Sequence, residues 1–360
     1  MEIWLIILAV AIFLGLVYAF IMFLRYKANL NRSFEMVFLD VRVPKKESKE
    51  DREIEGDQYS TQKDFKEITG GVMSQFFESL HSLYNSDLNA ILKSQDFLSF
   101  EYAVLDGVVH FFIVCPARLL SLVEKQLTSF YPDVYVEQVE DYNIFQPHSQ
   151  VSSTQVKMTA PFWQPIKTYS RMNVDPINTI INSLSKIGDE EGAAVQIMTR
   201  PVKGGWQKKG RSKANEIFQN KKSSGFAWYN PLSWFAAILE LLVHGEAIGG
   251  GDSPAEKTTP LTDEEVKAIE EKNDRPGFET IIRLVSSAPS KKMADVNLIA
   301  MKSAFQQFNT SNNNSIDFTK YHSNKNVVAN YIFRNFKRGV THRLFQPISI
   351  FSADELASLF

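Results

Sequence analysis

The residues best suited to bind a charged ligand lie in a basic stretch around Trp206. Cations beside an aromatic ring suit single-stranded nucleic acid or lipid headgroups. A short apolar run, "NPLSWFAAILELLVHGEA", follows and favours lipid, because aromatic side chains of such a helix lie at headgroup level. A solvated helix face is the alternative. The candidate contact residues are Lys203, Trp206, Lys208, Lys209, Arg211, Lys213, Trp228 and Trp234.

Motifs for catalysis are missing from the sequence. The nearest approach to a phosphate loop is "GDSPAEKT", which has Glu256 where the second glycine is required. Its side chain would put bulk and negative charge where the β-phosphate of a nucleotide would lie. The six histidines show no metal-ligand spacing, and no serine or cysteine lies in a nucleophile-elbow sequence. We therefore predict no enzyme activity, no cofactor and no metal site. The single cysteine, Cys115 in "VVHFFIVCP", excludes an internal disulfide and is predicted to be a buried thiol.

The N-terminus carries an uncharged run of 22 residues from Ile3 to Leu24. As a helix it would extend about 33 Å, against a hydrocarbon core of roughly 30 Å. A cleaved signal peptide would need a basic segment ahead of this run, where only Glu2 is charged. We predict a transmembrane anchor over residues 1–27. Its expected members are Trp4, Leu8, Phe13, Leu24, Arg25 and Lys27.

The charges after this run predict the cellular location. Arg25, Lys27 and Arg32 follow the apolar residues, and the side that carries lysine and arginine normally stays in the cytoplasm. We therefore expect a single-pass protein of the bacterial inner membrane, with the bulk of the chain in the cytoplasm.

The remaining chain shows the order βαββαβ twice, once over 33–148 and again over 153–322. The Asp106-Gly107 pair predicts a tight hairpin, and Asp175 before Pro176 predicts a helix start. The predicted fold class is α+β: one N-terminal transmembrane helix, then two tandem ferredoxin-like domains, the second with an insertion at about 203–276. A separate small domain formed by the insertion is the alternative.

Residues 323–360 are expected to form a C-terminal helix and linker. Ser352 and Glu355 have the spacing of a capping box, but only five residues follow Glu355. A helix this short is marginal in water, because nucleation is costly. The sequence alone therefore leaves open what stabilises this helix.

Three stretches carry a resemblance to a known family. "EGAAVQIMTRPVKGGWQKKGRS", "RPGFETIIRLVSS" and "FSADELASLF" resemble the N-terminal region of type IV secretion and conjugation-related ATPases of candidate-phyla bacteria, of the HerA/FtsK-like and TraD/TraG types. In that family the last helix leads into a motor domain with its own phosphate loop. The resemblance implies that a motor domain follows in a longer polypeptide or is encoded as a separate polypeptide.

The resemblance therefore implies a non-catalytic membrane-anchoring and assembly region of a DNA- or protein-translocating ATPase. The alternatives are a single-stranded DNA-binding module facing the cytoplasm and a stand-alone membrane scaffold. The expected partners are the inner membrane, a motor ATPase in cis or in trans, further copies of the chain in a homo-oligomer, and nucleic acid.

Overall fold

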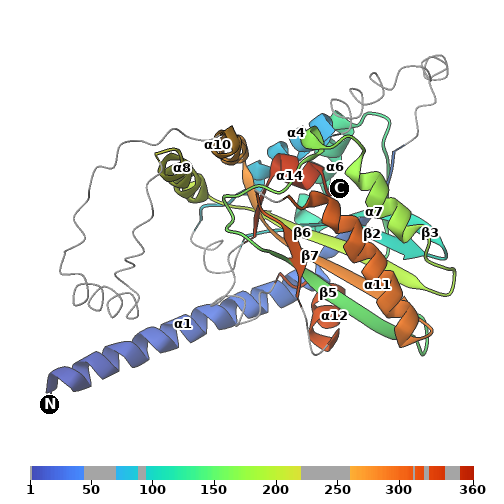
Figure 1. Cartoon of the computed structure of the whole chain (residues 1–360). Helices are drawn as coiled ribbons and strands as arrows, with labels where there is room; N and C mark the ends of the chain where they lie inside the picture. Colours follow the sequence, from blue (N-terminus) through green and yellow to red (C-terminus); the bar gives the residue numbers. More distant parts are fainter. Residues whose placement is uncertain are drawn as a thin grey trace.

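A long helix, α1 (Glu2–Phe34), leads into a body built on one antiparallel sheet (Figure 1). The structure is a computed structural model that describes residues 2–43, 70–87, 95–219, 260–310, 313–319, 324–336 and 349–360. The strands are β1 (Met36–Arg42), β2 (Leu98–Leu105), β3 (Val108–Pro116), β4 (Tyr135–Val139), β5 (Gln150–Met158), β6 (Gly192–Pro201), β7 (Gly277–Ala288), β8 (Ile316–Phe318) and β9 (Ile350–Ser352).

The helices lie on both faces of this sheet (Figure 1). The helices after α1 are α4 (Gly71–Leu80), α6 (Leu120–Phe130), α7 (Pro176–Leu184), α8 (Gly205–Phe218), α10 (Pro260–Asp274), α11 (Lys291–Phe305), α12 (Asn324–Ile332) and α14 (Ala353–Ala357). Of these, α8 and α10 pack against each other in a separate small apolar cluster. Side chains of α4, α6, α7, α11 and α14 share one large apolar core with one face of the strands. Tyr331 of α12 and Ile144 pack on the other face. The sheet is therefore the middle layer of the body.

The structure confirms the predicted hairpin, helix start and buried thiol. Asp106 and Gly107 both have positive φ, 50° and 74°, and they connect β2 to β3 in a tight hairpin. The Asp175 carboxylate accepts a hydrogen bond from the Ile177 amide and caps α7. Cys115 is buried, and that burial raises the pKa of its thiol to about 12.

The sheet itself corrects the predicted fold class. Its order is β4-β1-β3-β2-β6-β7-β5-β8, with β9 added beside β7. The two halves have corresponding strand orders, β4-β1-β3-β2 in the first and β8-β5-β7-β6 in the second. However, β2 and β6 pair directly, from Leu98 opposite Thr199 to Val104 opposite Ala193. The prediction of two tandem ferredoxin-like domains is wrong, because this pairing satisfies two strand edges and joins both halves into a single sheet with a shared core.

The predicted transmembrane anchor is the second correction. α1 does not end near Leu24 but continues to Phe34. Its last turns belong to the body, where Arg32 forms an ion pair with Asp96 at 3.2 Å and the Ser33 hydroxyl donates to the Phe333 carbonyl at 2.6 Å. Among the helices of the described residues, none combines the length and apolar character needed to cross a membrane. The predicted anchor at 1–27 and the single-pass inner-membrane location are therefore wrong.

Candidate functional site

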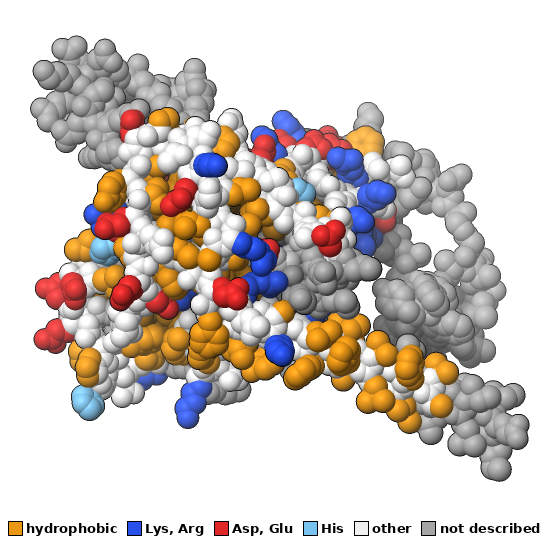
Figure 2. Space-filling model, turned by 180° about the vertical axis from the view of Figure 1, so that it is seen from behind, with side chains coloured by type: hydrophobic (Ala, Val, Ile, Leu, Met, Phe, Trp, Pro, Cys, Tyr) orange, Lys and Arg blue, Asp and Glu red, His pale blue; other side chains and the backbone are white. Residues whose placement is uncertain are grey.

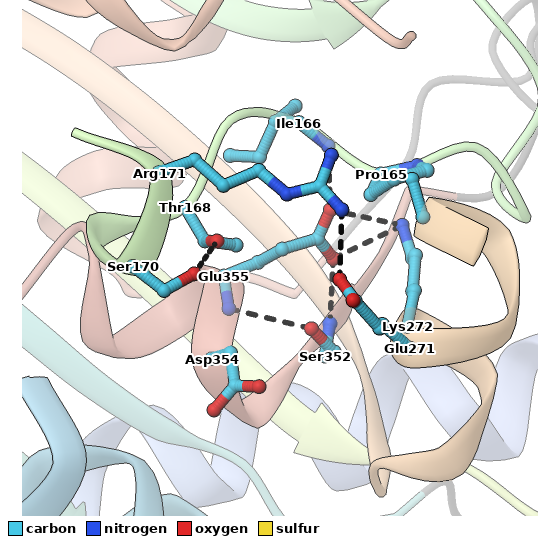
Figure 3. Close-up of a pocket in the computed structure, with 11 residues that line it drawn as sticks. Pro165, Ile166, Thr168, Ser170, Arg171, Glu271, Lys272, Ser352, Asp354 and Glu355 are labelled. Carbon is cyan, nitrogen blue, oxygen red and sulfur yellow. Dashed lines mark hydrogen bonds and ion pairs between the residues drawn. The ribbon is translucent and has the colours of Figure 1, made fainter. Parts of the chain in front are cut away.

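A small pocket lies where the C-terminal segment meets α10 and the loop 165–171 (Figure 3). It encloses about 50 Å³. β9 reaches this place by pairing with the start of β7, with Ser352 opposite Gly277. α14 begins at the next residue, so the pairing of β9 fixes where its first turn lies.

The first turn of α14 is held by the predicted capping box, which the structure confirms. The Glu355 amide donates to the Ser352 hydroxyl at 3.3 Å, and the Ser352 amide donates to Glu355 Oε2 at 2.7 Å. Both side chains are buried. The capping box therefore holds the carboxylate of Glu355 inside the protein.

Lys272 of α10 neutralises that buried carboxylate (Figure 3). Its ammonium lies 3.0 Å from Glu355 Oε2 and 3.2 Å from Oε1, and it also donates to the Gln164 carbonyl at 3.2 Å. Glu355 Oε1 accepts from the Ile166 amide at 2.7 Å as well. Burial lowers the pKa of Lys272, and the adjacent Glu355 carboxylate opposes that shift.

A buried lysine with a lowered pKa has the chemistry of a Schiff-base nucleophile. At Lys272, however, all of the ammonium donors have protein acceptors, and the side chain is only 1% exposed. A cavity of this size holds at most a water or two. Arg171 and Glu271 form a more exposed pair at 2.8 Å in the same lining (Figure 3). The pocket thus connects three chain segments, and its buried charges are used on partners within the protein.

A second buried polar cluster lies in the centre of the sheet, on the face that α12 covers. Glu101 of β2, Gln196 of β6 and Arg283 of β7 are cross-strand neighbours in one row. Gln196 donates to Glu101 at 3.0 Å, and Arg283 donates to Gln196 at 2.7 Å. The row therefore connects the two halves of the sheet through side chains as well as backbone.

Arg334, after α12, completes this cluster. It donates to both carboxylate oxygens of Glu101 at 3.1 Å and to Asp141 at 2.9 Å. Its φ is 44°, which is strained for a residue other than glycine, and these ion pairs hold it there. Burial raises the pKa of Glu101, but the Arg334 charge and hydrogen bonds from Ser99 and Tyr142 outweigh burial and leave the pKa below its ordinary value.

Both clusters use their charges on internal partners. Glu101 receives five hydrogen bonds from four side chains, which are listed here: Ser99, Tyr142, Gln196 and Arg334. Across the ranges that the structure describes, no group of three histidine, cysteine, aspartate or glutamate side chains could hold a metal ion. The geometry of the described clusters is therefore that of structural supports.

The predicted basic contact residues gather on and near α8, and their exposure differs. Lys203, Lys208, Lys209 and Arg211 are exposed, the last within 3.3 Å of Asp274. Lys213 is half-buried and donates to Glu216 at 2.5 Å. Trp206 is buried, with its indole against Gly277, so that ring offers no surface for a base to stack on. Trp228 and Trp234 lie outside the described residues.

The predicted anchor residues lie on a different element, α1. Phe13 is 65% exposed, and Lys27 is exposed. Leu24 and Arg25 are half-buried. The side chains of Trp4 and Leu8 are outside the described residues. The two predicted groups therefore lie on separate helices, α1 and α8.

Comparison with known proteins gives one result that covers most of the chain. A family model described as "Domain of unknown function (DUF8128)" matches residues 46–360. The chain belongs to the DUF8128 family. The DUF8128 region contains both buried clusters and α8, whereas α1 and β1 precede it. No curated protein matches the chain.

Sequence reasoning missed the cations of both DUF8128 clusters, Lys272 and Arg334. Lys272 lies in a charged helix that reads as solvated, and its partner is 83 residues away. Arg334 lies far from Glu101 in the sequence, with a separation of 233 residues. The only signal of either cluster was the capping box at Glu355.

Proposed function

We propose that this protein is a non-catalytic assembly component, which works by holding protein partners together. The observation that carries this proposal is α1, a 33-residue helix that extends away from the sheet body (Figures 1 and 2). Large apolar side chains are exposed along it, among them Phe13 at 65%, Leu16 at 65% and Phe20 at 61%. Monomeric proteins seldom expose contiguous apolar patches larger than a few hundred Å², and larger patches commonly mark interaction sites.

The buried clusters support a structural role for the body. Lys272 and Glu355 at the pocket bind partners within the protein, and so do Glu101 and Arg334 in the sheet. A rigid sheet tied together by such networks suits a platform on which other chains assemble.

The resemblance to the non-motor region of type IV secretion and conjugation-related ATPases names the system we propose. The three stretches that carry it adjoin one another in space, since β6 pairs with β7 and β7 pairs with β9. The proposed partner is accordingly an ATPase motor, in the same polypeptide or a separate one, for which this chain serves as the assembly region.

Chemical crosslinking in the native cells, followed by mass spectrometry, tests this function. We expect crosslinks from the body of this chain to an ATPase that carries G-x-x-x-x-G-K-[ST], and no ATP hydrolysis by residues 1–360 alone. Hydrolysis by the purified chain would refute the non-catalytic part. Crosslinked material without any such ATPase would refute the proposed partner.

A further inference from the structure

We propose that α1 pairs with α1 of a second copy of this chain through one defined stripe of side chains. This proposal rests on the assembly role above and deepens it by naming the partner of α1. The α1 stripe consists of Phe13, Leu16, Phe20, Phe23, Lys27, Leu30 and Phe34.

The spacing of the stripe is the first argument. Its members follow one another at intervals of 3, 4, 3, 4, 3 and 4 residues. This alternation is that of the a and d positions of a heptad, which stay on the side facing a partner helix when two helices supercoil. Six of the seven positions are apolar.

Exposure of the stripe is the second argument. Every member is exposed in the single chain, and the apolar members range from Leu30 at 38% to Phe34 at 74%. The a and d side chains of a coiled coil are normally covered by the partner helix. In the single chain no helix covers this face of α1 among the described residues. Figure 2 shows apolar side chains running along α1 as it leaves the body.

The area available fits a second copy. Six apolar side chains, four of them phenylalanine, would each bury on the order of 100 Å², roughly 600 Å² per chain in all. The flanking residues Val10, Ile12 and Val17 are also exposed and would bring the total toward the roughly 800 Å² per partner of a stable interface.

The C-terminal end of α1 is bound to the body, so the stripe is held in a fixed orientation. Arg32 pairs with Asp96 at 3.2 Å and donates to the Gln95 carbonyl at 3.3 Å, while Ser33 donates to the Phe333 carbonyl at 2.6 Å. Less conformational entropy is therefore lost on association. Lys27 is the single polar member of the stripe, and one polar a position restricts the register of paired helices at some cost in stability.

The test is the mass in solution of the full chain, by size-exclusion chromatography with light scattering over a range of concentrations. We expect twice the 41.0 kDa of one chain. Leu16→Glu combined with Phe20→Glu should raise the dimer dissociation constant at least about 100-fold, because two apolar side chains per copy lose their burial.

Tyr18→Glu is the matched control. Tyr18 is 61% exposed, as Phe20 is, but it lies on the opposite side of the helix from the stripe. The control should keep the dimer mass, and circular dichroism should show equal helix content in all variants.

Three outcomes would overturn the proposal. They are a wild-type chain that stays at 41.0 kDa at all concentrations, equal weakening by Tyr18→Glu, and recovery of the chain on phosphatidylcholine vesicles without any dimer. The assembly function is judged separately, because the ATPase crosslinks arise from the body. A dimer without those crosslinks would refute the proposed motor partner alone.

Discussion

α1 has 33 residues and leaves Phe13 and Leu16 each 65% exposed, whereas the five-residue α14 fully buries Leu356, and Leu359 just after it is fully buried too. Both helices are rich in apolar residues. An isolated helix as short as α14 is unstable in water, while one as long as α1 can form most of its own hydrogen bonds. The shorter helix therefore depends on the body along its whole length, whereas the longer one contacts it through its last turns.

The stabilisation of α14 is tertiary. Its capping box orients Glu355, Lys272 neutralises that carboxylate, and the Tyr102 hydroxyl donates to the Leu359 carbonyl at 3.0 Å. The Phe360 ring packs at 5.1 Å from that of Phe100. The short helix α14 is therefore stable because its apolar residues are part of the core that packs on the sheet. The comparison teaches that packing, and not helix length, decides which apolar segment is buried.

The largest expected effect is at the ion pair beneath α14. Glu355→Ala leaves the Lys272 ammonium buried without its partner, which should cost about 3–5 kcal/mol in the free energy of unfolding, measured by urea denaturation. Glu271→Ala removes the 54%-exposed partner of Arg171 from the same pocket and should cost under about 1 kcal/mol. Equal losses for the two variants would show that α14 does not depend on this pair.

The next largest effect is expected when one leucine is truncated at α14 and another on α1. Leu359→Ala should lower the free energy of unfolding by about 2–5 kcal/mol, because it opens a cavity in the core. Leu16→Ala on α1 should change it by less than about 0.5 kcal/mol, since the residue is largely exposed. Both are measured by thermal and urea unfolding at concentrations where the chain is monomeric. A large loss for Leu16→Ala would contradict the contrast between the helices.

Acidification should lower the free energy of unfolding through Glu101, which lies in the cluster next to the contact between α1 and the body. Because the folded-state pKa of Glu101 is lowered, its contribution to stability is present above the unfolded value near 4.5 and is lost as the pH falls through the folded value. Arg334, its partner, adjoins Phe333, which binds Ser33 of α1. Glu101→Gln should flatten the profile of unfolding free energy against pH below about 4.5, because the substituted side chain no longer binds a proton on acidification.

The smallest effect is expected on α8. Lys208→Glu combined with Arg211→Glu should weaken binding of fluorescent single-stranded DNA by less than about tenfold, because cations without a stacking ring give only weak, salt-dependent binding. Lys292→Glu on α11 combined with Lys325→Glu on α12, both at exposed lysines, is the control for the same change in net charge. Tight binding at physiological salt that the α8 variant abolishes would instead establish a nucleic-acid module.

Sequence reasoning succeeded where a signal lies within a few residues. The Asp106-Gly107 turn, the Asp175 cap and the Ser352–Glu355 capping box each depend on neighbours no more than three residues apart. The burial of Cys115 followed from the apolar residues around it. In each case the physical cause is local backbone conformation or local hydrogen bonding.

Tertiary structure decided what lies beyond that range. Backbone groups at the edge of β2 pair with those of β6, and no property of either strand identifies that partner. The same holds for Lys272 and Glu355, which β9 brings together by pairing with β7. The sequence by itself determined the short-range turns, caps and strands. Only the fold decided that the strands form one sheet and that α14 is buried while α1 extends from the body, because these outcomes depend on contacts between residues far apart in the chain.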